Sequence, residues 1–213
     1  MTDVYKLRPR SPFHFGVRGV GVEATGVVGP SDTLFSALCL VIRELRGVSA
    51  LEAFLSPFLD GNPPFLLSSA FPYAGDVLLF PRPWLRPDLG DLLDQDPRQA
   101  KVLKKVRFVS QGVLQALLRR EPLGGAFNEA NLLQRGRLWV TPQERATLAA
   151  ALEEPYVAWK SDSAPRVTVD RVTGASAVYQ AGYIHFQPGC GLYLLVQWLD
   201  ETERGLVEQA LRA

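Results

Sequence analysis

Between residues 34 and 45, apolar side chains recur every three or four positions, which places them on one face of a helix. Ser31 and Asp32 precede this run, and both residue types accept hydrogen bonds from the free amides at a helix N-terminus. We therefore expect a helix that Ser31 or Asp32 caps. A second helix is predicted to begin after Thr141, where Thr-Pro-Gln-Glu forms a capping box with proline at the first helical position, and to end near Glu153.

Shorter apolar runs between turn residues predict strands elsewhere in the chain. Strand character is found at residues 4–15, 65–67, 77–80 and 105–109, and a helix is expected over residues 111–120.

The C-terminal part is predicted to contain a linker, a hairpin and a helix. Residues 161–165 read Ser-Asp-Ser-Ala-Pro and favour a linker. Residues 178–186 and 192–199 are expected to pair around a Gly-Cys-Gly turn, and Asp200 with Glu203 is expected to cap the last helix. Strands and helices mixed in this way predict an α+β protein.

Composition limits the chemistry that the chain supports. Of its 213 residues, 47% are hydrophobic, and 23 basic against 22 acidic residues leave a net charge of +1. Any nucleic-acid surface must therefore come from local clustering of charge. Two cysteines without metal-ligand spacing, a solvated acidic loop over residues 88–96 and the absence of a phosphate-binding glycine motif predict no metal and no cofactor. We expect no membrane contact and a cytoplasmic location, because no signal sequence or long apolar run is present.

Four segments, in order along the chain, carry a resemblance to a known family. They are residues 11–16 with 31–38, residues 67–73 with 80–83, residues 104–109, and residues 165–171 followed by Tyr179 and residues 182–186. The Ser-Asp-Thr-Leu-Phe-Ser-Ala core at residues 31–37 is the most specific of them. Together they resemble the RAMP-superfamily protein that forms the fourth subunit of the type III-A CRISPR (Csm) effector complex.

The resemblance implies a fold, a role and partners. It implies ferredoxin-like (RRM-type) βαββαβ modules: an N-terminal module over residues 1–160 with a proline-rich and basic insertion, then a linker and partial second module over residues 161–213. Members of this family are described as non-catalytic subunits that bind the 5′ handle of the CRISPR RNA (crRNA). They sit against the large polymerase-cyclase subunit and next to a RAMP backbone subunit.

One feature departs from the family. RAMP proteins generally carry a glycine-rich loop close to the C-terminus, whereas this sequence stops at Ala213 directly after the last predicted helix. Either the native protein continues past residue 213, or this member lacks half of its second module.

RNA binding of this kind needs cations for phosphates and planar groups for unstacked bases. Lys105 and Arg107 lie in a basic segment whose alternative role is an ordinary solvated face. Ser31 and Thr33 could present hydroxyls and amides to a phosphate, and Arg171 could bind a phosphate or pair with Asp170. The predicted RNA-binding residues are His14, Ser31, Thr33, Lys105, Arg107 and Arg171, with stacking from Phe15 or Tyr183.

Two other functions stay open at this point. His14 and His185 are the only imidazoles, and a metal-independent RAMP endoribonuclease that processes CRISPR precursor RNA would need such groups as acid and base. A pure protein scaffold would use its basic residues to pair with an acidic partner. Salt-sensitive binding of intact RNA separates the RNA-binding role from both.

Overall fold

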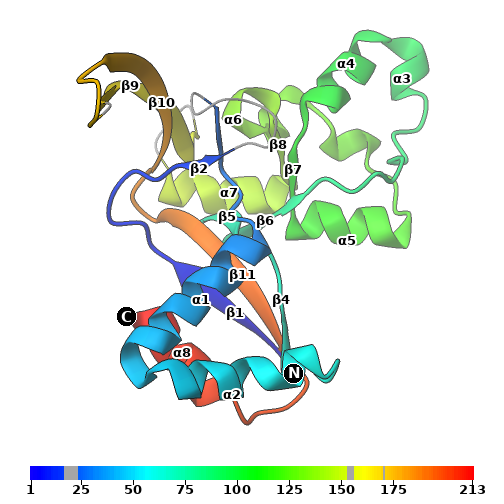
Figure 1. Ribbon diagram of the computed structural model, residues 1–213. Helices are drawn as coiled ribbons and strands as arrows, with labels where there is room; N and C mark the ends of the chain where they lie inside the picture. The colour runs from blue at the N-terminus through cyan, green and yellow to red at the C-terminus, as the bar shows by residue number, and fades with distance from the viewer. Residues whose placement is uncertain (17–23, 153–155, 170) are drawn as a thin grey trace. The chain divides into compact units, whose positions relative to one another are not determined.

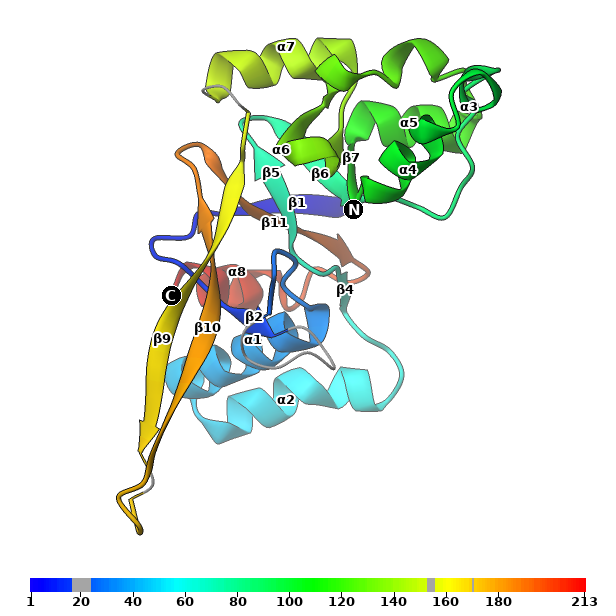
Figure 2. The same cartoon turned by 90° about the horizontal axis from the view of Figure 1, so that it is seen from above.

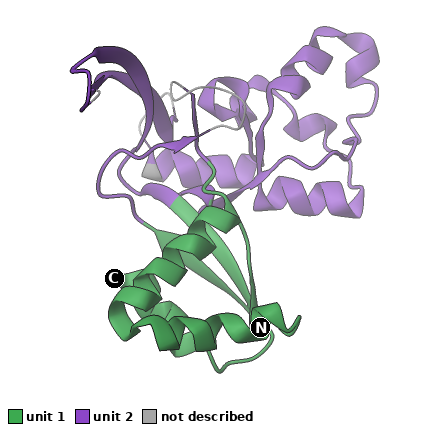
Figure 3. Ribbon diagram, viewed as in Figure 1, with its two compact units in different colours: residues 1–7, 28–70, 192–213 green, residues 8–27, 71–191 purple. Residues whose placement is uncertain are grey.

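The protein is a mixed α+β molecule, as predicted (Figures 1 and 2). The computed structural model describes residues 1–16, 24–152, 156–169 and 171–213. It divides into two compact units, coloured separately in Figure 3. Unit 1 holds residues 1–7, 28–70 and 192–213, and unit 2 holds residues 8–27 and 71–191. These units do not coincide with the expected division at residue 160, and the second ferredoxin-like module stays a prediction.

The sheet of unit 1 joins the start and the end of the chain. Its strands are β1 (Thr2–Leu7), β4 (Phe65–Leu67) and β11 (Cys190–Trp198). β11 pairs antiparallel with β1 through Val4↔Leu195 and with β4 through Val196↔Leu67. Since both neighbours run opposite to β11, β1 and β4 are parallel to each other.

Three helices cover one face of this sheet: α1 (Ser31–Arg46), α2 (Val48–Leu59) and α8 (Arg204–Arg212) (Figure 2). Along β1 every second side chain is half-buried, as a sheet with one covered face requires. Aromatic rings fill the space between helices and sheet, with Phe54 and Trp198 each packed against Phe65. The predicted apolar face of α1 is buried or half-buried as far as Ile42, whereas Leu45 at its end is exposed.

The expected caps of two helices in unit 1 are wrong. α1 begins at Ser31 itself with Pro30 at its N-cap, and no side chain accepts a capping hydrogen bond there. Glu203 occupies the N-cap of α8, again without a side-chain hydrogen bond. The carboxylate of Asp200 instead accepts the amide of Thr202 in the preceding turn.

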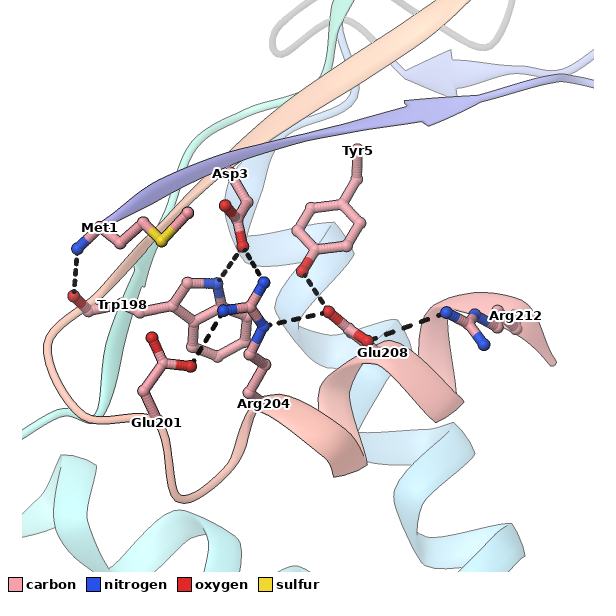
Figure 4. Close-up of polar contacts among 8 residues, drawn as sticks. All are labelled: Met1, Asp3, Tyr5, Trp198, Glu201, Arg204, Glu208 and Arg212. Carbon is pink, nitrogen blue, oxygen red and sulfur yellow. Dashed lines mark hydrogen bonds and ion pairs between the residues drawn. The ribbon is translucent and has the colours of Figure 1, made fainter.

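A polar network fixes α8 to β1 and β11 (Figure 4). The guanidinium of Arg204 lies 2.8 Å from the carboxylate of Asp3 and 3.2 Å from that of Glu208. Tyr5 donates its hydroxyl to Glu208 over 3.0 Å, and the indole of Trp198 donates to Asp3 over 2.9 Å. The hydrogen bond from Tyr5, followed by that from Arg204, holds the pKa of Glu208 below its ordinary value.

Four consecutive strands of unit 2 pair in the order in which they occur in the chain. β5 (Phe71–Ala74) and β6 (Val77–Pro81) form a hairpin, β6 pairs antiparallel with β7 (Phe108–Ser110), and β7 pairs parallel with β8 (Leu138–Trp139). Buried apolar side chains, Val109 and Trp139 among them, pack against α5 in its core. The helical segments are α3 (Leu92–Gln95), α4 (Arg98–Lys105), α5 (Gln111–Arg119), α6 (Leu133–Gly136) and α7 (Pro142–Ala151), with short 3₁₀ turns at Gly124–Ala126 and Glu129–Asn131.

Glu144 connects the starts of two helices. Together with Thr141 it forms the predicted capping box of α7, with Pro142 at the first helical position. Its carboxylate also accepts the amide of Gly112 over 2.8 Å and the hydroxyl of Ser110, the N-cap residue of α5. One side chain thus satisfies helix-end donors of both α5 and α7. The capping box is confirmed, whereas Glu153, where this helix was expected to end, lies outside the described residues.

The predicted C-terminal hairpin is wrong. β10 (Ser176–Phe186) pairs along its whole length with β9 (Trp159–Val169), and β11 pairs with β1 and β4 instead. The expected linker over residues 161–165 lies inside β9. β2 (Phe15–Gly16) and β3 (Thr25–Gly26) form a further two-residue ladder. The strands themselves were recognised, but not their partners.

Acid will weaken the protein through Glu208. A carboxylate whose folded pKa is lowered contributes stability above its unfolded pKa, about 4.3 for glutamate, and loses it as the pH falls through the folded pKa. Between pH 7 and pH 3, the melting temperature followed by circular dichroism should therefore fall more steeply for the wild type than for Glu208→Gln. Glu52→Gln, which changes an exposed carboxylate on α2, is the matched control. Equal pH dependence of wild type and Glu208→Gln would contradict the role of the network.

Removing the Glu144 carboxylate should destabilise unit 2. Glu144→Ala leaves the amide of Gly112 and the hydroxyl of Ser110 without their acceptor, and we expect the free energy of unfolding to fall by roughly 1–3 kcal/mol. Chemical denaturation measures this change. Gln143→Ala alters an exposed neighbour on the same helix and should have little effect.

Candidate nucleic-acid interface

Five basic residues gather at one edge of the sheet in unit 2. β6 ends where β7 begins, through Pro81↔Phe108, and β7 begins beside the start of β8, through Phe108↔Leu138. The residues that follow β6 and precede β7 and β8 therefore share one edge. We call this set the basic edge; its members are Arg82, Lys105, Arg107, Arg135 and Arg137.

Backbone hydrogen bonds hold three members of the basic edge side by side. The amide of Arg82 donates to the carbonyl of Arg107 over 2.9 Å, and the amide of Arg107 donates to the carbonyl of Arg137 over 2.8 Å. Neighbouring strands lie about 4.8 Å apart, so the three backbone positions span roughly 10 Å. The Nε of Arg82 also donates to the carbonyl of Val106 over 3.2 Å, which fixes its guanidinium.

The charges of the basic edge lack local compensation. Four of the five side chains are exposed, and that of Arg82 is half-buried. In the part of the chain that the structure describes, none of the five forms an ion pair with a carboxylate. Several cations of one sign close together raise the local concentration of a polyanion. The basic edge thus has the electrostatic character that phosphate binding needs.

An unusual turn presents two members of this edge. Leu133 and Leu138 form an antiparallel bridge, and the labelled segment α6 between them is a tight turn rather than a right-handed helix. Gln134 and Arg135 both lie in the left-handed region, with φ of 53° and 58°. For residues with a Cβ atom this conformation costs about 1–2 kcal/mol each, so the surroundings must hold the turn.

The buried side chain of Gln134 holds this turn in place. Its side-chain amide donates to the carbonyl of Trp159 over 2.6 Å and accepts the amide of Ala158 over 2.9 Å. The turn that carries Arg135 and Arg137 is therefore tied to the residues at which β9 begins.

The β9–β10 hairpin is the second feature of the candidate interface. Figure 2 shows the two strands as one long twisted ribbon. At its base Phe186 stacks on Phe13 and packs against Trp159. Farther out, every described residue from 171 to 180 is exposed. A two-stranded ribbon without a covering layer is only marginally stable on its own, so its aromatic base orders it.

One face of the hairpin carries an aromatic and basic pair. The guanidinium of Arg166 lies 5.5 Å from the ring centroid of Tyr183, and its Nε donates to the Tyr183 hydroxyl over 2.8 Å. Arg166 is exposed, and Tyr183 is half-buried. The pair offers a planar cationic surface in a fixed orientation.

The predicted site residues fall into separate places. Lys105 and Arg107 come together on the basic edge, although Lys105 ends helix α4 rather than starting a strand. His14 lies at the hairpin base, where its Nδ1 donates to the carbonyl of Gly182 over 2.7 Å. Arg171 lies in the hairpin turn, and its alternative partner Asp170 is outside the described residues.

The two hydroxyl residues belong to unit 1. Thr33 is exposed, and its amide donates to the carboxylate of Asp32 over 2.7 Å. Ser31 is half-buried, and its amide donates to the hydroxyl of Ser69 over 3.2 Å.

Sequence reasoning missed the other members of the basic edge. Arg82 lies in a segment that carried the family resemblance, but nothing in the local pattern showed that it meets Arg107. The Arg-Gly-Arg run at residues 135–137, directly before an apolar run, is a signal that could have drawn attention to the turn. Only the strand register brings the three segments together.

The described residues contain no group of three or more histidine, cysteine, aspartate or glutamate side chains placed to hold a metal ion. Within the same residues, no helix combines the length and the apolar character that crossing a membrane requires.

Comparison with known proteins gives one consistent answer. No family model matches the chain. The CRISPR system Cms protein Csm4 of Thermococcus onnurineus (strain NA1) is 28% identical over 213 residues, which cover 97% of this chain and 59% of the relative. The chain is Csm4-like. It spans about three fifths of the length of this curated relative.

Solved structures show the same likeness. A chain in the crystal structure of the Csm1-Csm4 cassette in complex with AMPPNP matches 99% of the Csm4-like chain and 65% of its own length, with a TM-score of 0.63 and 25% identity. A chain of the Csm3-Csm4 subcomplex in the type III-A CRISPR-Cas interference complex matches 98% of the Csm4-like chain and 62% of its own length, with a TM-score of 0.64. At 18% identity, this second likeness is one of fold.

Gln134 should prove necessary for the turn of the Csm4-like chain. Gln134→Ala leaves the Ala158 amide and the Trp159 carbonyl unpaired in a buried place, so we expect a loss of roughly 1–3 kcal/mol in the free energy of unfolding. Hydrogen exchange at the Ala158 amide should accelerate in the variant. Gln115→Ala, an exposed position on α5, is the matched control. Unchanged protection of Ala158 in Gln134→Ala would show that the turn is held by other contacts.

Proposed function

We propose that the chain is a non-catalytic RNA-binding subunit of a type III-A CRISPR interference complex, where it binds the 5′ handle of the crRNA. The observation that carries this proposal is the basic edge: five cations on one sheet edge, without a described counter-charge, in a protein whose net charge is only +1. An ordinary solvated face intersperses charges of both signs. A surface of one sign suits the phosphate backbone of a nucleic acid.

The order of elements in unit 1 supports a ferredoxin-like fold of the RAMP type. β1 and β4 are parallel, α1 and α2 connect them, β11 lies antiparallel between them, and α8 follows β11. This arrangement is a split βαβ unit, the basis of the ferredoxin-like fold. In the sequence, residues 71–191 of unit 2 are inserted between the second and third strands of unit 1, and residues 8–27 lie between its first strand and α1. Unit 2 contains the basic edge and the β9–β10 hairpin.

The matching structures support a proposal about partners. The Csm4 proteins of the matching structures are found with Csm1 and with Csm3. We propose that this chain likewise contacts the large polymerase-cyclase subunit and a RAMP backbone subunit, in the cytoplasm. The exposed hairpin, with Val167, Val172 and Val178 unburied at its outer half, is a candidate for such a contact or for insertion beside RNA.

Each predicted residue has a proposed role in RNA binding. Lys105 and Arg107 bind phosphates together with the other members of the basic edge. His14 keeps Nε2 available for RNA because its Nδ1 is bonded to Gly182, and Arg171 contacts RNA at the hairpin turn. Ser31 and Thr33 offer hydroxyls at the start of α1 in unit 1.

A salt series tests the RNA-binding role. We expect handle-bearing crRNA to bind more tightly than the same RNA without the handle, with affinity that falls as salt rises. Lys105→Ala/Arg107→Ala should reduce the slope of log K against log salt by about 1.4, if each residue neutralises one phosphate of a single strand. Filter binding measures both quantities, and the recovered RNA should be intact.

The control uses the same residue types from the same segment. Arg98→Ala/Lys101→Ala removes two exposed charges of α4 that are not part of the basic edge, and it should leave the slope nearly unchanged. Equal slopes for both double variants would refute the basic edge as the binding surface. Defined cleavage products that vanish on His14→Ala would indicate a nuclease, and no RNA binding at all would indicate a scaffold.

A further inference from the structure

Trp84 is the one tryptophan that the fold leaves in water. The other three, Trp139, Trp159 and Trp198, are 0%, 5% and 4% exposed, whereas Trp84 is 101% exposed. It forms no aromatic pair or cation–π contact with any other described residue. A large planar side chain held wholly in solvent has no part in packing the core and offers both ring faces to a partner.

The segment around Trp84 is stiff and anchored at the basic edge. It reads Pro-Arg-Pro-Trp-Leu-Arg-Pro over residues 81–87, and each proline fixes its own φ and restricts the residue before it. Arg82 is bonded to Val106 and Arg107, as described above. Two residues of chain reach at most about 7 Å, so Trp84 stands within that Cα distance of Arg82. Little conformational freedom is left for a ligand to remove.

Charge decides which kind of partner this ring suits. Arg82 and Arg86 flank Trp84 in the sequence, and the other four cations of the basic edge continue from Arg82. A groove of about 740 Å³ begins next to it at Leu85, but its lining carries both signs of charge, Asp94 and Arg120 among them, and does not include Trp84. The mixed charge of the groove suits a protein surface. An aromatic ring beside several cations instead matches a nucleic-acid strand, which carries negative phosphates and planar bases.

We propose that Trp84 stacks on a base of single-stranded RNA whose phosphates lie along the basic edge. The inference rests on the proposed function and adds a contact of a different kind to it. The cations hold the backbone, and the ring binds an unstacked base through its π face. Because every base has such a face, this contact tolerates sequence and does not by itself select the handle.

Fluorescence of the intact chain tests the proposal directly. The three buried tryptophans are shielded from acrylamide, so the quenchable emission comes mainly from Trp84. Adding handle-bearing crRNA should change that emission and protect it from acrylamide. Trp84→Ala should weaken RNA affinity roughly five- to hundred-fold, as loss of one base–aromatic stack does, while Trp84→Phe keeps most of the affinity.

The salt slope separates this contact from the phosphate contacts. Trp84→Ala should weaken binding at every salt concentration without changing the slope, whereas Lys105→Ala/Arg107→Ala changes the slope. Leu85→Ala, the partly exposed neighbour on the same segment, is the control and should bind like the wild type. Since Trp84 packs against no core residue, its variants should melt with the wild type, and a melting curve checks this.

The remaining outcomes distinguish the two proposals. RNA binding of unchanged affinity in Trp84→Ala, with acrylamide access to Trp84 unaltered by RNA, overturns the stacking contact and leaves RNA binding standing. If Trp84→Ala instead keeps RNA affinity but loses binding to the purified large subunit, the ring serves a protein interface and the proposal is wrong. Failure of the wild type to bind any RNA overturns both.

Discussion

The pairing of β11 with two strands from the first third of the chain is the contact on which unit 1 depends. Asp3 and Trp198 are joined by a hydrogen bond although 195 positions separate them. Closing so long a loop has an entropic cost that local structure cannot offset, and the sheet gains its order only when β11 is in place. The Arg204 network and the aromatic packing around Phe65 then act on elements that β11 has already brought together. The stability of unit 1 is therefore cooperative and does not come from local structure alone.

Register plays the corresponding role in unit 2. No two of the three segments that form the basic edge are adjacent in the sequence, and a one-residue slip of β7 would reverse the faces of its side chains. The left-handed turn at Gln134 adds a second constraint, because its backbone conformation persists only while the buried amide remains bonded to Ala158 and Trp159. A surface held in this way is rigid before any ligand arrives, which lowers the entropy that a binding partner would cost.

What could be predicted from the sequence was mostly local. The capping box at Thr141, the apolar face of α1 and the short strands after Pro64 are encoded within a few neighbouring residues, and the structure contains all of them. The partner of each strand is not encoded within neighbouring residues in this way. Residues 176–186 and 190–198 adjoin a turn that suits a hairpin, yet each finds its partner elsewhere.

The residues of the candidate site also divide into those that the sequence predicted and those that only the fold brings together. The two central cations, Lys105 and Arg107, stood out as a basic cluster, whereas Arg82 and Arg137 join them only through strand pairing. Full exposure of Trp84 is likewise a property of the fold, since an isolated tryptophan between prolines is equally compatible with burial.

At position 135, thermal stability and the charge of the basic edge favour different residues. Glycine or asparagine would occupy its left-handed backbone position with less strain, and a chain selected only for resistance to heat would drift toward them. Arginine there retains a charge at the tip of the turn while giving up part of the stability margin. Directed evolution for thermal stability would thus favour substitutions of Arg135, and these would remove one charge from the basic edge. A laboratory that wants a hardier variant should hold residue 135 fixed and seek its gains in the helices of unit 1.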